Sequence, residues 1–225
     1  MRVQAVIPAA GMGERLGASR PKALVEINGV PLLRHTLLRL ASLLTPLPCI
    51  VSYPEGFRNE FEHACCDLNV VLIRGGRERQ ESVWLALNVL DPQVEIVLLH
   101  DAARPFPDPA SIQCAVEETK KWGAATLAIP VSDTILSVSE DGFLKDTPDR
   151  RELRACQTPQ IFLKETITAA HRAAHEEGRQ FTDDASMVRF YGGQVKIVPG
   201  TVGNFKITTP ADLAYATYLV QEGKE

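Results

Sequence analysis

Residues 3–17 read VQAVIPAAGMGERLG, an uncharged and mostly apolar run followed at once by a glycine-rich loop. The run Val3–Pro8 has the length of a β-strand, which predicts a strand buried in the core. Glycines directly after such a strand allow backbone N–H groups to approach a bound anion closely. The stretch therefore predicts an α/β fold that begins with a central strand and an anion-binding loop.

The rest of the chain continues this alternation of strands and helices. Strands are expected at Cys49–Ser52, Val70–Ile73, Ile96–His100 and Ala124–Ile129, and helices at Pro31–Leu44, Arg79–Leu90 and Pro109–Trp122. Apolar strands separated by helices are typical of a parallel sheet that is covered on both faces. The sequence therefore predicts a Rossmann-like three-layer sandwich with a mostly parallel sheet.

Polar residues predict where three helices begin. Asp108 precedes a proline, as an N-cap residue precedes a proline at the first helical position. Thr209 also precedes a proline, and Asp212 is placed to complete a capping box. The Thr182–Asp184 stretch is expected to open a helix that runs to Phe190.

The segment 131–150, VSDTILSVSEDGFLKDTPDR, interrupts the alternation. Thr134–Val138 has a β-like pattern, Glu140–Gly142 reads as a turn, and Phe143 and Leu144 begin a short return strand. We expect a β-hairpin arm that projects from the domain. Because the chain has no linker, repeat or low-complexity tract, residues 1–225 are expected to form one domain that includes this arm.

Composition excludes several classes of protein. The formal net charge of −4 argues against a free nucleic-acid-binding protein, which would usually be basic. The five cysteines lack C-x-x-C spacing and suit a reducing compartment better than a disulfide framework or a zinc site. The N-terminal apolar run is too short for a signal peptide, and three prolines break the uncharged stretch 40–54. We therefore expect a cytoplasmic protein.

The glycine loop fits neither of two well-known phosphate loops. Leu16 stands where the dinucleotide fingerprint needs a third Gly or Ala, and residues 16–18 lack the Gly-Lys-Ser/Thr of a P-loop. Arg15 lies inside the loop and Lys22 follows it closely. Two cations around a backbone nest suit a triphosphate, whose charge must be neutralised when pyrophosphate leaves.

Four strings of sequence together carry a family resemblance. Pro8-Ala9-Ala10-Gly11-x-Gly13-x-Arg15-Leu16, followed by Pro21-Lys22, resembles the signature of sugar-phosphate nucleotidyltransferases. The others are Gly75-Gly76-x-x-Arg79-x-x-Ser82-Val83, His100-Asp101-Ala102-Ala103-Arg104-Pro105 and Asn204-x-Lys206-Ile207-Thr208. With them the whole chain resembles the 2-C-methyl-D-erythritol 4-phosphate cytidylyltransferases of the non-mevalonate isoprenoid pathway.

The resemblance implies the transfer of CMP from CTP to 2-C-methyl-D-erythritol 4-phosphate, giving 4-diphosphocytidyl-2-C-methyl-D-erythritol and pyrophosphate. The nucleophile is then a phosphate oxygen that is already an anion, so catalysis requires positioning and charge neutralisation by cations and Mg²⁺. The catalytic residues that the resemblance implies are Arg15, Lys22, Arg150 and Lys206. Nucleotide binding is implied for Ala9, Ala10, Gly11, Gly13, Gly76 and Ser82, acceptor binding for Arg104, Thr134, Arg150 and Thr182, and metal binding for Asp101. Arg77 follows the paired glycines, where some relatives carry an acid, so the contacts to the base can differ here.

The resemblance also implies a homodimer in which the 131–150 arm brings Arg150, with Thr134, to the partner's active site. Simpler roles compete with some assignments. Thr182 could serve as a helix N-cap, Asp101 could cap a turn at a strand end, and His100 is expected to be structural.

Two other functions remain open from the residues alone. One is a ribitol 5-phosphate cytidylyltransferase, which shares the loop and also uses a linear polyol phosphate. The other is a catalytically silent nucleotide-binding or scaffold protein. The joint presence of Arg15, Lys22, Asp101 and Lys206 argues against a silent protein, which would not need these charges.

Overall fold

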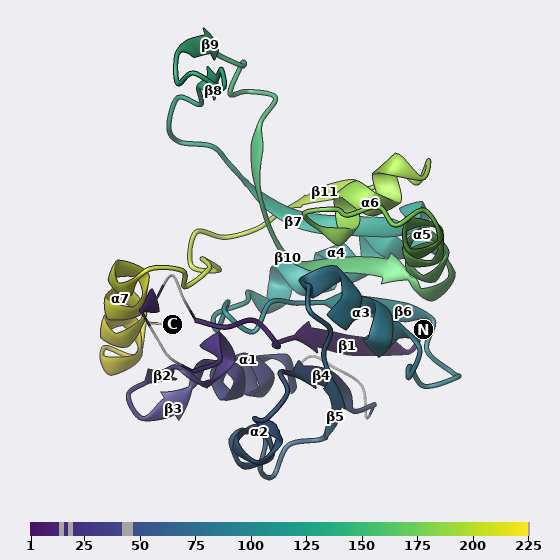
Figure 1. Ribbon diagram of the computed structural model, residues 1–225, viewed down its shortest axis with the longest axis vertical. Coiled ribbons are helices and arrows are strands. Elements are labelled where there is room, and N and C mark those ends of the chain that lie inside the picture. The colour runs from purple at the N-terminus through teal and green to yellow at the C-terminus, as the bar shows by residue number, and fades with distance from the viewer. Residues whose placement is uncertain (14–15, 18–19, 42–46, 225) are drawn as a thin grey trace.

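The computed structural model describes residues 1–13, 16–17, 20–41 and 47–224. Within these residues a seven-stranded sheet has the order β11-β7-β10-β6-β1-β4-β5 (Figure 1). Its strands are β1 (Val3–Pro8), β4 (Cys49–Tyr53), β5 (Val70–Arg74), β6 (Ile96–Leu99), β7 (Ala124–Pro130), β10 (Arg154–Leu163) and β11 (Lys196–Pro199). Two small antiparallel pairs are β2 (Glu26–Ile27) with β3 (Val30–Pro31) and β8 (Ser137–Val138) with β9 (Leu144–Asp146).

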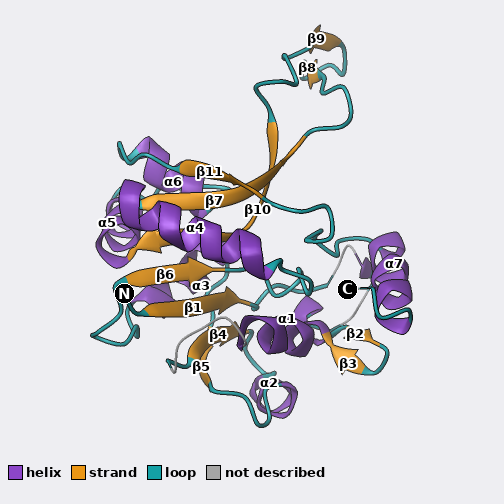
Figure 2. Cartoon of the chain, turned by 180° about the vertical axis from the view of Figure 1, so that it is seen from behind, coloured by secondary structure: helices purple, strands orange, loops and turns teal. Residues whose placement is uncertain are grey.

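Helices cover both faces of the sheet. They are α1 (Leu32–Ala41), α2 (Arg58–Ala64), α3 (Arg79–Leu87), α4 (Pro109–Trp122), α5 (Lys164–Glu176), α6 (Asp184–Phe190) and α7 (Pro210–Gln221), with a short 3₁₀ helix η2 (Lys22–Leu24). Helices α3, α5 and α6 lie on the face toward the viewer in Figure 1, and α1 and α4 on the opposite face, which Figure 2 presents. The expected three-layer α/β architecture is confirmed.

The alternation of side chains along β1 explains the two layers of core. Val3, Ala5 and Ile7 join the apolar cluster beneath α1, α2 and α4. Val6 points the other way, into the cluster beneath α3, α5 and α6. Because successive strand residues face opposite sides, a strand buried on both faces needs an apolar residue at nearly every position. The run that opens the sequence meets this requirement.

Local signals account for the helix boundaries. Leu33, Leu37 and Leu40 are buried along one face of α1, at helical spacing. The Asp108 side chain accepts a hydrogen bond from the N–H of Ser111 at the start of α4, which ends at a left-handed Gly123 with φ 85°. Glycine adopts this conformation without the penalty that a side chain would bring.

One strand departs from the parallel arrangement. β10 runs antiparallel to both of its neighbours, β6 and β7, whereas β1, β4, β5 and β6 are parallel to one another. The pairing register of β10 with β7 shifts between Cys156 and Gln160. Because the four parallel strands end at the same edge, the loops after β1, β5 and β6 meet there.

The sequence-based expectations differ from the structure at a few boundaries. α1 ends at Ala41 within the described residues, and the remaining expected helix residues 42–44 lie outside them. α3 ends three residues earlier than Leu90, and the N-cap of α6 is Asp183, not Thr182. The sequence did not predict α2, α5 or β10. Every helix in the described part of the chain is too short or too polar to cross a membrane.

The segment 131–150 forms the expected hairpin arm. β8 and β9 pair at its tip, and Gly142 turns between them with φ 85°. Both views show the arm extending away from the sheet (Figures 1 and 2). Its apolar side chains are largely exposed, with Leu136 at 52%, Phe143 at 73% and Leu144 at 63%. The arm therefore gains little support from its own chain.

Candidate active site

A cavity of about 260 Å³ opens at the carboxyl edge of the parallel strands. Loops after β1, β5 and β6 form it, together with Lys22 and Lys206 from farther along the chain. It brings together eight of the residues predicted from the sequence: Ala9, Ala10, Gly11, Lys22, Gly76, Ser82, Asp101 and Lys206. Ligands commonly bind at this edge of an open α/β sheet.

The loop after β1 folds back on itself at the mouth of the cavity. The Lys22 N–H donates to the carbonyl of Gly11 at 3.1 Å, and the N–H of Gly13 donates to the carbonyl of Arg20 at 3.3 Å. At its start, the Ala9 N–H donates to the Ser52 hydroxyl on β4. These bonds hold the described parts of the loop beside η2 and place the Lys22 side chain at the cavity. Arg15 lies outside the described residues.

Gly76 lines the opposite wall, and Gly75 precedes it in the same loop. A Cβ atom at Gly75 would lie 2.5 Å from the Cβ of Ala10, so only glycine allows the two loops to approach this closely. Buried Ser82 braces this wall, because its hydroxyl accepts from the Gly76 N–H and donates to the Glu78 carbonyl, each at 3.1 Å. The serine hydroxyl therefore shapes the loop that lines the cavity.

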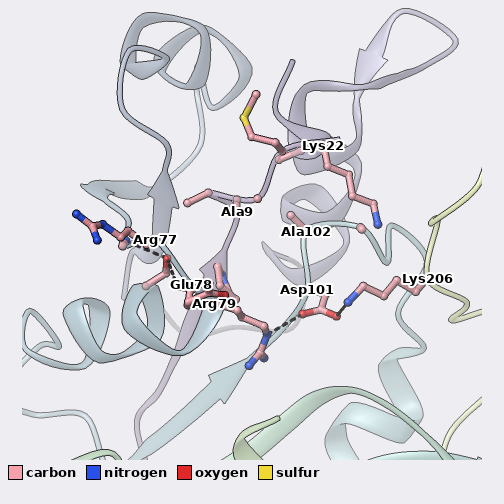
Figure 3. Close-up of a pocket in the computed structure, with 16 residues that line it drawn as sticks. Ala9, Lys22, Arg77, Glu78, Arg79, Asp101, Ala102 and Lys206 are labelled. Carbon is pink, nitrogen blue, oxygen red and sulfur yellow. Dashed lines mark hydrogen bonds and ion pairs between the residues drawn. The ribbon is translucent and has the colours of Figure 1, made fainter. Parts of the chain in front are cut away.

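Asp101 follows β6 at the floor of the cavity and is surrounded by cations. Its carboxylate lies 2.7 Å from Lys206 Nζ and 3.3 Å from Arg79 Nε, and Figure 3 shows these two side chains reaching it from opposite sides. Arg104 Nε lies 3.9 Å away. Burial alone would raise the pKa of Asp101, but the charges of Arg79, Lys206 and Arg104 hold it well below its ordinary value. Asp101 is therefore a fixed negative charge among positive ones.

His100 is structural, as expected. Its ring is fully buried, with Nε2 3.0 Å from the carbonyl of Arg104 and Nδ1 3.0 Å from the hydroxyl of Thr158. A carbonyl only accepts, so Nε2 carries the proton and Nδ1 accepts from Thr158. Thr158 in turn accepts from the N–H of Asp101 at 3.0 Å. Burial lowers the pKa of His100 to about 4, which keeps the ring neutral.

Arg104 is buried beneath the cavity instead of lining it. One terminal nitrogen donates to the carbonyl of Asn204 at 2.7 Å and the other to the carbonyl of Cys156 at 3.3 Å. The Asn204 amide donates to the carbonyl of Thr158 at 2.8 Å. These bonds fasten the loop that carries Lys206 to β10. The acceptor role implied for Arg104 stays a prediction.

Like Arg104, the other three residues implied in acceptor binding do not line this cavity. Thr134 and Arg150 belong to the arm, where Arg150 donates to the carbonyl of Ser132 at 3.1 Å. Thr182 is exposed and lies two residues before the first residue of α6. Within the described residues, one chain therefore assembles the nucleotide side of the predicted site but not its acceptor side.

Two charged residues without a predicted role join the site. Arg79 bridges Asp101 to the buried carboxylate of Asp184, its Nη1 lying 2.6 Å from Asp184 Oδ2. Asp184 also contacts Nε2 of His171 at 2.8 Å. Arg79 was visible in its motif, but nothing local in the sequence indicates a partner so far along the chain.

The cavity suits a divalent cation that is bound partly by substrate phosphates. It suits less well a metal ion whose ligands all come from the protein. Among the described residues, no group of three or more His, Cys, Asp or Glu side chains gathers as a metal site. Asp101 offers a deprotonated carboxylate at the cavity floor. Mg²⁺ commonly takes one or two carboxylates and completes its shell with substrate phosphates and water. The single carboxylate of Asp101 is compatible with this mode of binding, and its metal role stays a prediction.

Comparisons with known proteins agree along the whole chain. A family model described as "IspD: 2-C-methyl-D-erythritol 4-phosphate cytidylyltransferase" matches residues 3–222. A relative of that name from Caldanaerobacter subterraneus subsp. tengcongensis is 40% identical, covering 99% of this chain and all of the relative. Another from Bacillus mycoides is 41% identical over 98% of both chains. The crystal structure of the Thermus thermophilus enzyme of this name has a TM-score of 0.84 and 32% identity, covering 98% of this chain and 100% of that one.

Proposed function

This chain belongs to the family of 2-C-methyl-D-erythritol 4-phosphate cytidylyltransferases, and we propose how its own residues divide the work of that reaction. The enzyme transfers CMP from CTP to 2-C-methyl-D-erythritol 4-phosphate and releases pyrophosphate. Neither alternative, a ribitol 5-phosphate enzyme or a silent nucleotide-binding protein, is favoured by the comparisons. The observation that carries our assignment is the cluster of Arg79, Lys206 and Asp101 facing the same cavity as Lys22.

The reaction needs no side chain as nucleophile. A phosphate oxygen of the acceptor forms a bond to the α-phosphorus of CTP, and the bond from that phosphorus to the bridging oxygen of pyrophosphate breaks. The electron pair leaves with pyrophosphate, so negative charge builds on the leaving group. Preorganised cations stabilise such a transition state most effectively, and we assign this role to Arg15, Lys22 and Lys206.

Lys206 has the freedom that this role requires. Its side chain is 39% exposed while its ammonium pairs with Asp101 at 2.7 Å. Its loop is meanwhile fastened at Asn204 by Arg104. We propose that the lysine turns from Asp101 to the α-phosphate when CTP binds, while the backbone of the loop stays in place.

The nucleotide is proposed to lie across the two glycine loops. Ala9 and Ala10 leave room beside the base and ribose, and Gly11 and Gly13 let the backbone approach the phosphates. Gly76 and Ser82 complete the wall. The packing of Gly75 against Ala10 supports this arrangement, because it brings the two loops close together at the cavity.

We propose that Asp101 holds a Mg²⁺ ion together with phosphate oxygens of CTP. When bound there, the ion would neutralise phosphate charge and fix the orientation of the triphosphate. Arg79 and Arg104 keep the carboxylate deprotonated and oriented beside it. The carboxylate then offers its negative charge to the ion without first losing a proton.

The acceptor side is proposed to be completed by a second copy of the chain. Residues 1–225 would form one nucleotidyltransferase domain, with 131–150 as its dimerisation arm. The exposed apolar side chains of the arm support this, because an isolated hairpin is marginally stable in water. In a twofold dimer, each arm would carry Arg150 and Thr134 to the partner's cavity, where Thr182 and Arg104 would also serve the acceptor.

We further propose that the protein works in the cytoplasm. Its five cysteines are free, as expected in a reducing compartment. Burial raises the pKa of Cys49 and of Cys65 to about 11, so these two thiols are poor nucleophiles at neutral pH.

A pyrophosphate-release assay tests the proposed function directly. The enzyme is supplied with each of the four nucleoside triphosphates, in combination with 2-C-methyl-D-erythritol 4-phosphate or ribitol 5-phosphate, with and without Mg²⁺. We expect rapid release only with CTP, the methylerythritol phosphate and the metal together. Equal rates with ribitol 5-phosphate or with UTP would refute the substrate assignment.

A further inference from the structure

The first turn of α3 connects the nucleotide side of the site to the loop that carries Thr182. This turn follows the loop residues Gly76, Arg77 and Glu78, which line the cavity. Its first two residues, Arg79 and Gln80, extend their side chains in the direction of the 179–184 loop. Gln80 bonds the loop before Thr182, and Arg79 bonds it after Thr182.

Gln80 binds the loop before Thr182 through backbone groups. Its side-chain oxygen accepts from the N–H of Phe181 at 2.9 Å, and its side-chain nitrogen donates to the carbonyl of Arg179 at 2.9 Å. One amide thus satisfies a donor and an acceptor of an irregular loop, as a neighbouring strand would do. Since Phe181 is adjacent to Thr182, this pair of bonds fixes the position of the backbone immediately before Thr182.

Arg79 binds the loop after Thr182 through Asp184. The carboxylate of Asp184 is 1% exposed and lies 2.6 Å from Arg79 Nη1. The N–H groups of Asp184 and Ala185 both donate to the buried side-chain oxygen of Gln160 on β10, at 3.1 and 2.9 Å. The start of α6 is therefore fixed to both α3 and the sheet.

The bonds made by Gln80 and Arg79 fix the two ends of one short segment. Between Phe181 and Asp184 lie only Thr182 and Asp183, and Asp183 is occupied as the N-cap of α6, accepting from the N–H of Ser186 at 2.7 Å. The exposed hydroxyl of Thr182 is thereby presented from a loop whose ends are both fixed. A binding group that is held in a fixed geometry orients the substrate that it contacts.

We propose that Gln80 and Arg79 are positioning residues that hold Thr182 in place for the acceptor phosphate. The inference rests on the acceptor role proposed above for Thr182. Gln80 acts without contact to the nucleotide, because it does not line the cavity, whereas Arg79 also contacts Asp101 at the cavity floor. Substitution of Gln80 therefore tests the positioning of Thr182 without changing a residue that lines the cavity.

The test compares Gln80→Ala, Thr182→Ala and the double variant by steady-state kinetics with each substrate varied. We expect Gln80→Ala to raise KM for the acceptor about tenfold, the effect of losing two ordinary hydrogen bonds, and to leave KM for CTP within about twofold. In the Thr182→Ala background, Gln80→Ala should add little further change. The matched control is Gln113→Ala, at an exposed position of α4, and it should resemble the parent.

Hydrogen exchange supplies a readout besides activity. The amides of residues 179–184 should exchange faster in Gln80→Ala than in the parent, while β1 and β6 should be unchanged. The proposal is overturned if loop exchange and acceptor KM are both unaltered, or if the effects of the two substitutions multiply in the double variant. If Thr182→Ala itself leaves acceptor KM unchanged, the acceptor role of Thr182 fails and the inference fails with it. If Thr182→Ala raises KM and Gln80→Ala does not, only the inference fails.

Discussion

At the scale of single residues, the site depends on charges held in fixed relation to one another. Asp101 contacts Lys206 and Arg79, and Arg79 continues to Asp184. Breaking one partner of a buried pair leaves the other charge uncompensated, which costs more than the pair contributes. Substitutions at the exposed rim of the cavity separate catalysis from folding more cleanly than substitutions in this network.

Lys22 lines the cavity and is half-buried. Lys22→Ala should lower kcat at least about a hundredfold, the scale seen when one preorganised electrostatic contact is removed. Its midpoint of thermal unfolding should change little, because Lys22 lies in a three-residue 3₁₀ helix at the cavity and outside the buried apolar core. Pyrophosphate release and a circular-dichroism melt measure the two effects. Lys121→Ala on α4 is the control, and an unchanged kcat in Lys22→Ala would remove Lys22 from the catalytic groups.

His100 gives the protein a pH dependence of stability. Burial lowers its pKa from the ordinary 6.5 to about 4, so between these values the unfolded chain binds a proton that the folded chain does not. Stability is therefore lost as pH falls through this window, by about 2 kcal/mol between pH 7 and pH 5. Urea unfolding of the parent and of His100→Asn at the two pH values measures it. The parent should lose more stability than the variant, and equal losses would contradict the assignment.

Motifs indicated which residues gather at the cavity, but not what each one touches. Ala9, Lys22 and Asp101 were predicted from short strings and do line it. Arg104 was expected to bind the acceptor, and that role stays a prediction, but no motif indicated its bonds to the backbone carbonyls of Asn204 and Cys156 beneath the cavity. The pairing of Arg79 with Asp184 depends on tertiary packing, which no local pattern encodes.

At the scale of elements, the best-predicted helices are those whose ends carry their own signals. α4 was predicted to the residue, because Asp108 caps its first turn and Gly123 ends it. β10 escaped prediction because Gln157, Thr158 and Gln160 interrupt its apolar pattern. Those polar side chains are buried and bonded across the structure, a compensation that the sequence does not show.

The cap of α4 can be tested by itself. Asp108→Ala removes the acceptor for the N–H of Ser111 and should cost about 1 kcal/mol of stability, lowering the unfolding midpoint by about 2–4 °C. Asp108→Asn should retain most of the stability, because asparagine caps nearly as well. Differential scanning calorimetry measures both variants. A loss as large in Asp108→Asn as in Asp108→Ala would show that the cap is not the cause.

At the scale of the whole molecule, the arm raises the question of which chain completes each site. Arg150 lies in the arm and not at the cavity of its own chain. If two chains share sites, a defect in the cavity and a defect in the arm can be combined so that one site is intact. Lys22→Ala and Arg150→Ala form such a pair.

Each of these variants should be nearly inactive alone. After mixing and subunit exchange, a heterodimer has one site with both defects and one site with neither, so activity should recover to about a quarter of the parent value at random pairing. Native mass spectrometry verifies the exchange, and each variant mixed with itself is the control. Exchange without recovery would show that Arg150 serves its own chain and would leave the cytidylyltransferase assignment intact.

The strand order has a consequence for how the protein is made. β6 is entirely apolar and fully buried, and one of its two neighbours, β10, joins it through Gln160–Leu163. As the chain leaves the ribosome, β6 emerges long before β10, and β7 cannot cover the gap because it pairs with β10 and β11. The edge of β6 that later pairs with β10 therefore stays unpaired, with its backbone N–H and C=O groups exposed, until residue 163 has been made. β10 is the strand that closes this edge and so protects the strands made before it from aggregation. A chain whose translation stalls before Leu163 would leave the edge open and would depend on a chaperone.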